Sequence, residues 1–90
     1  MIYKIIFSES FEHQLRRFNL NTQKRILEKL DYLALNSQLA KKLSFTPKNL
    51  KNLSKYRVGN LRILLVVDHK NTTLFCYELN HRGKIYKNFY

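Results

Sequence analysis

The sequence predicts an α+β domain of the order β-α-α-β-β-β, in which a helical hairpin packs on one face of a mainly antiparallel sheet. Two segments in the first half repeat apolar residues at helical spacing. Three segments in the second half are rich in β-formers and are separated by short turns, which require antiparallel pairing. A chain of 90 residues is enough for one domain, so we expect residues 1–90 to form a single unit.

The first half is predicted to contain one strand and two helices. Residues 2–7 form a short apolar run typical of a buried strand. Ser8 then offers an N-cap for a helix of about three turns. Residues 19–22 break this pattern with capping residues of their own, and a second amphipathic helix ends near Asn36. The apolar stripes are Phe11, Leu15 and Phe18 in the first helix, and Ile26, Leu27, Leu30, Leu33 and Ala34 in the second.

The second half is predicted to contain a loop and a three-stranded meander. Residues 37–50 lack periodicity and include Pro47, so we expect a loop. The last eleven residues mix basic and aromatic side chains in a short C-terminal tail. The predicted strands cover residues 53–58, 61–68 and 73–79, joined by turns at 59–60 and 69–72.

A two-residue turn at Gly59-Asn60 fixes the register of the first hairpin, since both residue types adopt positive φ at low cost. In this register Arg57 faces Arg62, and like charges in that position are destabilising. An anion that usually lies between them would explain the pair. Alternation places Lys55 on the same face as both arginines, and the helices cover the other face. The core-facing positions are Tyr56, Val58, Leu61, Ile63, Leu65 and Val67.

Basic residues are concentrated in one half of the chain. Seventeen Lys and Arg stand against six Asp and Glu, for a net charge of +11. Residues 41–67 contain basic residues and no acidic one. This distribution favours a polyanionic partner, which can be a nucleic acid, an acidic membrane surface or an acidic protein segment.

Other features exclude several classes of protein. One cysteine, Cys76, excludes a disulfide framework, and on a buried strand it is expected to be a small hydrophobe. The longest apolar run, residues 63–67, is too short to span a membrane, and the N-terminus lacks the pattern of a signal peptide. We therefore expect a cytoplasmic protein. No acidic cluster or Cys/His spacing indicates a metal site, so no cofactor is expected.

Two motifs are similar to those of the RelE/ParE superfamily of toxins from type II toxin–antitoxin pairs. They are KYRVGNLRILLVVD at residues 55–68 and HRGKIYKNF at residues 81–89. The resemblance extends over nearly the whole chain and implies the RelE-like fold. Members of the RelE branch are metal-independent endoribonucleases that cut mRNA in the ribosomal A site, and a cognate antitoxin neutralises them. ParE members instead poison DNA gyrase.

The resemblance also implies roles for individual residues. Arg62 matches the arginine that holds the scissile phosphate, and Arg82 and Tyr86 match the closing motif. Two departures are Leu61, where many members have Tyr, and Leu53, where some have Lys. The expected catalytic residues are Lys55, Arg62, His81, Arg82 and Tyr86, and the expected nucleic-acid-binding residues are Lys51, Lys55, Arg57, Lys84 and Lys87.

The chemistry of RNA cleavage is consistent with these residue types. The 2′-OH is the nucleophile, so the enzyme must supply cations for the phosphate and groups that move protons. An arginine fork pairs two phosphate oxygens. His81 is one candidate for the proton transfer because imidazole titrates near neutrality. Lys55 is another, since neighbouring arginines favour its neutral amine, and Tyr86 can stack on a base or protonate the leaving 5′-oxygen.

A purely structural interpretation, with no role in catalysis or binding, stays open for each of these residues. Lys55 and Arg57 can be a solvated strand face, His81 a surface residue, and Tyr86 a ring packed at the edge of the core. Three function classes remain: a ribosome-dependent endoribonuclease toxin, a gyrase inhibitor or degenerate toxin that only binds, and a plain RNA-binding module. Both toxin classes imply an antitoxin with an acidic amphipathic helix as partner.

Overall fold

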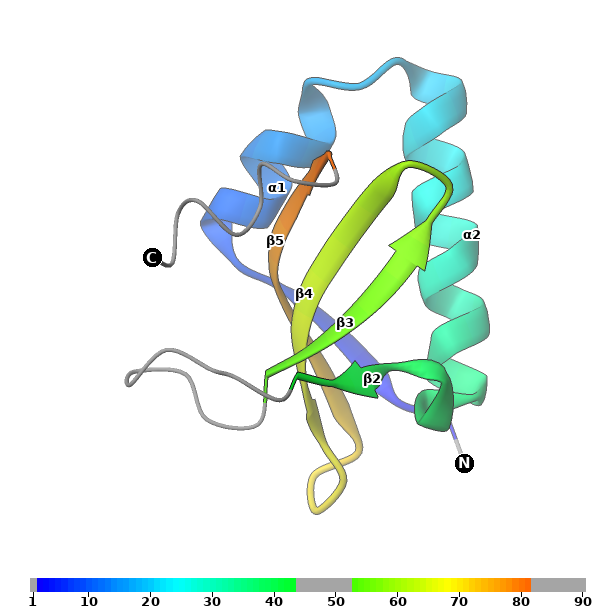
Figure 1. Cartoon of the computed structure of the whole chain (residues 1–90), viewed down its shortest axis with the longest axis vertical. Helices are drawn as coiled ribbons and strands as arrows, with labels where there is room; N and C mark the ends of the chain where they lie inside the picture. The colour runs from blue at the N-terminus through cyan, green and yellow to red at the C-terminus, as the bar shows by residue number, and fades with distance from the viewer. Residues whose placement is uncertain (1, 44–52, 82–90) are drawn as a thin grey trace.

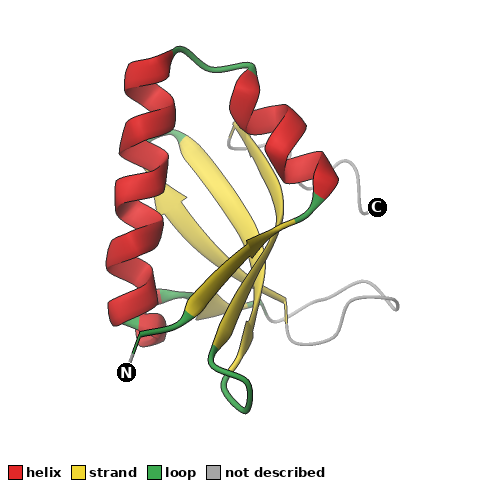
Figure 2. Ribbon diagram, turned by 180° about the vertical axis from the view of Figure 1, so that it is seen from behind, coloured by secondary structure: helices red, strands yellow, loops and turns green. Residues whose placement is uncertain are grey.

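The computed structural model describes residues 2–43 and 53–81, and in this part of the chain two helices lie on one face of a mixed sheet (Figures 1 and 2). The strand order is β1-β5-β4-β3-β2, with β1 parallel to β5 and every other pair antiparallel. The predicted α+β class is confirmed. The elements are β1 (Lys4–Phe7), α1 (Glu9–Arg16), α2 (Leu20–Leu35), the 3-10 helix η1 (Ser37–Leu39), β2 (Lys41–Lys42), β3 (Leu53–Val58), β4 (Leu61–Asp68) and β5 (Thr73–His81).

The first helix begins where the sequence predicts and ends earlier. The Ser8 hydroxyl accepts a hydrogen bond from the Phe11 N–H at 2.9 Å, which is the expected N-cap. The helix ends at Arg16, so Phe18 lies beyond it, although its ring still packs against the core. Asn19 explains the early end, because its extended backbone and its 2.8 Å bond from the Thr22 N–H start α2 at the next residue.

One predicted core position of α2 is wrong. Ile26, Leu30 and Leu33 are fully buried, whereas Leu27 is 38% exposed. The buried residues follow the i, i+4, i+7 spacing of a narrow stripe, and Leu27 is turned by about 100° from Ile26. The sheet therefore covers a narrower face of this helix than the sequence indicates.

The prediction of a loop over residues 37–50 is also wrong in its described part. Ser37–Leu39 form η1, and Lys41–Lys42 form the short edge strand β2. Lys41 pairs with Lys55, and the Leu43 N–H donates to the Leu53 carbonyl at 3.0 Å. Two residues cannot show a period, so the sequence holds no signal for this strand.

Strand bounds differ modestly from the expected ones. The first strand begins at Lys4 rather than Ile2, which is 71% exposed, and its residues are at most half-buried. This follows from its place at the sheet edge. At the other end, β5 continues to His81, two residues beyond the predicted end.

A β-bulge interrupts the pairing of β4 with β5. Leu64 pairs with Glu78 and Leu65 pairs with Cys76, which leaves Tyr77 as the extra residue on β5. Side chains alternate along a strand, so one extra residue moves every later side chain to the opposite face. Leu74 and Cys76 face the helices before the bulge, and Leu79 faces them after it.

Both faces of the sheet bury apolar side chains. The larger cluster lies under the helices and includes Phe11, Ile26, Leu30 and the core-facing residues of β3 to β5. A second cluster lies on the other face, where Leu53 and Leu64 are buried and pack with further apolar residues. The face that the sequence leaves open is therefore partly apolar. These further residues are Leu43, Val66 and Tyr77.

Helix α1 and its N-cap supply hydrogen-bond partners to the backbone of β5 beyond the end of β1. Strand β1 pairs with β5 only as far as Cys76, so β1 does not pair with the next carbonyls and N–H groups of β5. The Ser8 hydroxyl donates to the Tyr77 carbonyl at 2.8 Å, and the Gln14 Oε1 accepts the Leu79 N–H at 2.6 Å. The Gln14 Nε2 also donates to the Glu78 carboxylate at 2.5 Å. One glutamine thus joins α1 to the sheet and satisfies its backbone.

Replacing Gln14 should destabilise the fold. In Gln14→Ala the part-buried Leu79 N–H and the Glu78 carboxylate lose their partner, so the free energy of unfolding should fall by about 1–3 kcal/mol. Urea unfolding measures this change. Asn21→Ala, on an exposed position of α2, is the control and should stay within about 0.5 kcal/mol. Equal effects of the two variants would contradict the stabilising role of the Gln14 hydrogen bonds.

Cys76 should be chemically inert in the folded chain. Burial raises the pKa of its thiol to about 12, from 9.0 for an ordinary cysteine, and the side chain is fully buried. A thiol reagent such as Ellman's at pH 8 should therefore report no reactive group until urea is added. The folded state keeps its proton where the unfolded state loses it, so stability should fall as the pH rises from about 9 towards 12. Rapid labelling without urea would contradict the burial.

Candidate nucleic-acid interface

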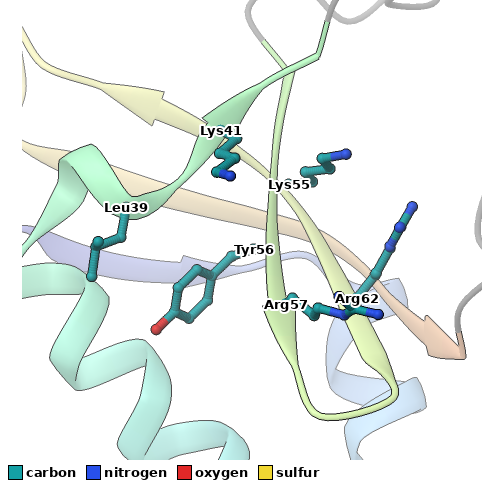
Figure 3. Close-up of a pocket in the computed structure, with 6 residues that line it drawn as sticks. All are labelled: Leu39, Lys41, Lys55, Tyr56, Arg57 and Arg62. Atoms are coloured by element: carbon teal, nitrogen blue, oxygen red, sulfur yellow. The ribbon is translucent and has the colours of Figure 1, made fainter.

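The hairpin of β3 and β4 has the register that the sequence predicts. Gly59 has a φ of +59°, as the first central residue of a type II′ turn requires. Arg57 pairs with Arg62, so the predicted like-charge pair is confirmed. In Figure 3 the side chains of Lys55, Arg57 and Arg62 extend to the same side of the hairpin, and Tyr56 extends to the other side, towards α2.

A second like-charge pair lies next to the first. Lys41 of β2 pairs with Lys55 of β3, two residues along the strand from Arg57. We call the four residues Lys41, Lys55, Arg57 and Arg62 the basic cluster. Three strands supply it, because β2 is attached to β3 beside the hairpin. Lys41 is not predictable from the sequence, since its position depends on the short strand β2.

The basic cluster lines a pocket of about 320 Å³ at this edge of the sheet. Among the described residues that line it, none carries a carboxylate, so the positive charges of the cluster reinforce one another. A pocket with several cations and an open mouth suits a phosphodiester, whose oxygens the planar guanidinium groups can pair in twos. The lining residues are Leu39, Lys41, Lys55, Tyr56, Arg57 and Arg62 (Figure 3).

The two carboxylates of the sheet are engaged elsewhere. Asp68 lies at the end of β4 away from the hairpin turn and accepts two hydrogen bonds from Asn71, at 3.1 and 2.7 Å. These bonds lower the pKa of Asp68, the side-chain one most. Glu78 accepts hydrogen bonds from Ser10 and Gln14 of α1. The acidic groups of the strands therefore stabilise a turn and a helix contact.

Tyr56 belongs to the pocket but cannot act as a base there. Burial raises the pKa of its hydroxyl, and the nearby Tyr32 raises it further. The phenol consequently stays protonated at neutral pH, where it can donate a hydrogen bond and its oxygen can accept one.

His81 does not join the basic cluster. It pairs with the core-facing Leu61, and its ring centroid lies 5.9 Å from that of Phe18, on the helix side of the sheet. There it lines a separate pocket of about 220 Å³ with Arg25 and Thr22. The bulge at Tyr77 explains this position, because simple alternation from Cys76 would have placed His81 on the same face as Arg62. Asn80 instead lies opposite Arg62 in the register.

Several expected site residues lie outside the described part of the chain. Within that part, the structure brings Lys55, Arg57 and Arg62 together and adds Lys41. No group of three or more His, Cys, Asp and Glu side chains among residues 2–43 and 53–81 is arranged to hold a metal ion. In the same residues no helix is long and apolar enough to cross a membrane. The site residues outside the described ranges are Lys51, Arg82, Lys84, Tyr86 and Lys87.

Comparison with known proteins finds matches among solved structures and none at the level of sequence families. No protein-family model matches the sequence, and no curated protein matches it. Among solved structures, the chain is similar to one in the RelBE2 toxin–antitoxin complex of Mycobacterium tuberculosis, with a TM-score of 0.75, 19% identity and coverage of 91% of this chain and 100% of the other.

Two archaeal complexes give similar matches. That of RelE with RelB from Pyrococcus horikoshii has a TM-score of 0.75 and 22% identity, covering 93% of this chain and 99% of the other. The RelB–RelE complex of Methanococcus jannaschii has a TM-score of 0.64 and 27% identity, covering 94% and 99%. The chain therefore has the fold of RelE toxins, and the resemblance noted in its motifs is supported by its tertiary structure.

Neutralising one arginine of the pair should stabilise the fold. In Arg57→Gln the repulsion across the hairpin disappears, so the free energy of unfolding should rise by about 0.2–1 kcal/mol at low salt. The gain should shrink in 1 M salt, where charges are screened within about 3 Å. Urea unfolding at both salt concentrations tests this. Arg16→Gln, an exposed position on α1, controls for the general loss of positive charge, and an equal gain there would contradict the pairwise repulsion.

Proposed function

We propose, on the premise that this chain has the RelE fold, that it is the toxin of a type II toxin–antitoxin pair. Its activity is that of a ribosome-dependent, metal-independent endoribonuclease that cuts mRNA in the A site. The observation that carries the proposal is the position of Lys55, Arg57 and Arg62 on one side of the β3–β4 hairpin, in a pocket whose described lining holds no carboxylate. Such a site binds a phosphodiester and offers a neighbouring amine for proton transfer.

The proposed reaction uses the nucleophile that RNA carries. The 2′-oxygen forms a bond to phosphorus and the bond from phosphorus to the 5′-oxygen breaks. One group accepts the 2′ proton and another donates a proton to the leaving oxygen. The products are a 2′,3′-cyclic phosphate, which can open to a 3′-phosphate, and a 5′-hydroxyl. Charge increases on the phosphate oxygens in the transition state, so fixed cations accelerate the step.

The residues take the following roles in this proposal. Arg62 and Arg82 hold the scissile phosphate, and Arg57 assists or contacts a neighbouring one. Lys55 is favoured over His81 as the base because Lys55 lines the same pocket as Arg62, whereas His81 packs near Phe18 and lines a separate pocket. Tyr86 stacks on a base or protonates the leaving 5′-oxygen. Lys51, Lys84 and Lys87 contribute further contacts to the nucleic acid.

The proposed partner is an antitoxin with an acidic amphipathic helix. The solved structures that the chain resembles include complexes of RelE with RelB. Two features of this chain suit such a partner: a net charge of +11, and apolar side chains exposed along α2. The most exposed of these are Leu20, Tyr32 and Leu35.

A gyrase inhibitor of the ParE type, or a degenerate toxin that only binds, is the second candidate. Leu53 is the observation that favours it. Some RelE members carry a lysine at this position, whereas here the leucine is 1% exposed and packs against Leu64. The site thus has one cation fewer than in those members.

Primer extension on a reporter mRNA in a reconstituted translation system tests the proposal. The purified chain should produce cuts at codon positions only when ribosomes are present. Arg62→Ala should reduce the cleavage rate by roughly 100-fold or more, because it removes a cation from the developing charge. Arg16→Ala, an exposed arginine of α1, is the matched control and should cut like the wild type.

The outcome of this experiment distinguishes the nuclease from the gyrase inhibitor. Cuts that persist in Arg62→Ala, or products with a 5′-phosphate, would contradict the proposed mechanism. No cuts in any lane, together with inhibition of gyrase supercoiling by the same preparation, would establish the second candidate instead.

A further inference from the structure

The pocket of the basic cluster has a second side that the proposed cleavage does not use. Tyr56 lies between Lys55 and Arg57 in β3, so alternation directs it to the opposite face of the sheet. It nevertheless lines the same pocket as both neighbours, together with Leu39. A pocket can include both faces of a sheet only where it passes around an edge.

The short length of β2 creates that edge. Its pairing with β3 covers Ser54 and Lys55 and does not continue to Tyr56. From Tyr56 to Val58, β3 therefore has β4 on one side and no β2 partner on the other. The pocket lies around this step, with the basic side chains on one face and Tyr56 and Leu39 on the other. Figure 3 shows Lys41 between these two groups.

Tyr56 is held firmly enough to act as a platform. Its side chain packs against the main core while remaining part of the pocket wall. In Figure 3 its ring extends from β3 towards α2, and Leu39 of η1 lies on the same side. A ring that is already fixed loses little conformational freedom when a ligand stacks on it. The second side thus consists of an aromatic ring and an aliphatic side chain next to an ammonium group.

We propose that Tyr56 and Leu39 form a subsite for one nucleobase of a single-stranded RNA, with Lys41 on the adjoining backbone phosphate. The strand passes around the edge of β3, from the phosphate at Arg57 and Arg62 to a base on the helix side. The assignment to RNA rests on the proposed function. Cations beside an aromatic ring are the usual composition of a single-strand site, because the backbone is charged and every base has a flat apolar face.

A nucleobase suits this side of the pocket better than an acidic peptide does, for a physical reason. A carboxylate-rich segment would need only the basic cluster and would gain nothing from the Tyr56–Leu39 side. A nucleotide uses both sides, since its phosphate and its base are covalently linked. The subsite also has a testable property, because stacking depends on the base and phosphate contacts do not.

The test is a cycle of equilibrium binding measurements that pairs a protein change with an RNA change. Fluorescence anisotropy follows the full-length chain binding to a labelled RNA hexamer at low salt. The hexamer is used intact and in a series in which one nucleotide at a time lacks its base. Loss of one stack should weaken binding roughly 5- to 100-fold. Tyr56→Leu should weaken binding to the intact RNA by this factor. It should cause no further loss with the one abasic hexamer that lacks the base stacked on Tyr56.

Matched variants keep the result independent of folding. Tyr56→Phe retains the ring and should bind like the wild type, and Leu39→Ala should weaken binding of the same base. Ile2→Ala removes an exposed aliphatic side chain that does not line the pocket and should have no effect. Thermal unfolding by circular dichroism identifies any variant that fails to fold, and Leu39→Ala then carries the test in place of Tyr56→Leu.

Four results would overturn the subsite. The first three are a wild-type chain that does not bind the hexamer, Tyr56 and Leu39 variants that bind like the wild type, and abasic losses that add to those of Tyr56→Leu. The fourth is a competing acidic peptide whose binding also depends on Tyr56, which would assign the pocket to a protein. Cleavage on ribosomes is measured separately. Coupling of Tyr56 to a base without any cleavage supports the subsite and counts against the nuclease, and cleavage without coupling does the reverse.

Discussion

The register of the β3–β4 hairpin is the constraint on which the rest of the structure depends. The positive φ of Gly59 sets a two-residue turn, and this turn fixes which residues of the two strands pair. A shift by one residue would turn Ile63 and Leu65 out of the main core and bring Arg62 into it. The hydrophobic pattern therefore requires the same register that places Arg57 opposite Arg62. Repulsion between the two arginines is tolerated because burial of several large side chains on β3 and β4 outweighs it.

Burial on both faces makes this hairpin a rigid support for its cations. The helices cover one face, and the cluster of Leu53 and Leu64 fills part of the other. The strand backbone beneath Lys55 and Arg62 is thus held from two sides, while the charged ends of these residues lie at the pocket. A fixed backbone limits the conformations of the attached side chains. A site of preorganised cations is what stabilisation of developing phosphate charge needs.

The other end of the sheet depends on a single bulge and a single helix. The extra residue at Tyr77 turns Leu79 into the core, directs Asn80 towards the face of Arg62 and places His81 against Phe18. The bonds from Ser8 and Gln14 of α1 complete the backbone of β5 just after β1 ends. The same helix hence stabilises the core and keeps the end of β5 in place next to the hairpin. As a result, Asn80 rather than His81 pairs with Arg62 in the sheet.

The sequence by itself determined the helices, the three-stranded meander and the Arg57–Arg62 pair, because caps, turns and apolar periodicity act between residues that are close in the chain. It also indicated Lys55 and Arg62 as a basic site, through alternation along one hairpin. Only the tertiary structure decided the pairing of Lys41 with Lys55, the side of the sheet on which His81 lies, and the inclusion of Tyr56 in the basic pocket. Each of these depends on contacts between distant segments: a two-residue strand with no period of its own, a bulge that inverts the alternation, and a part of β3 that β2 does not reach.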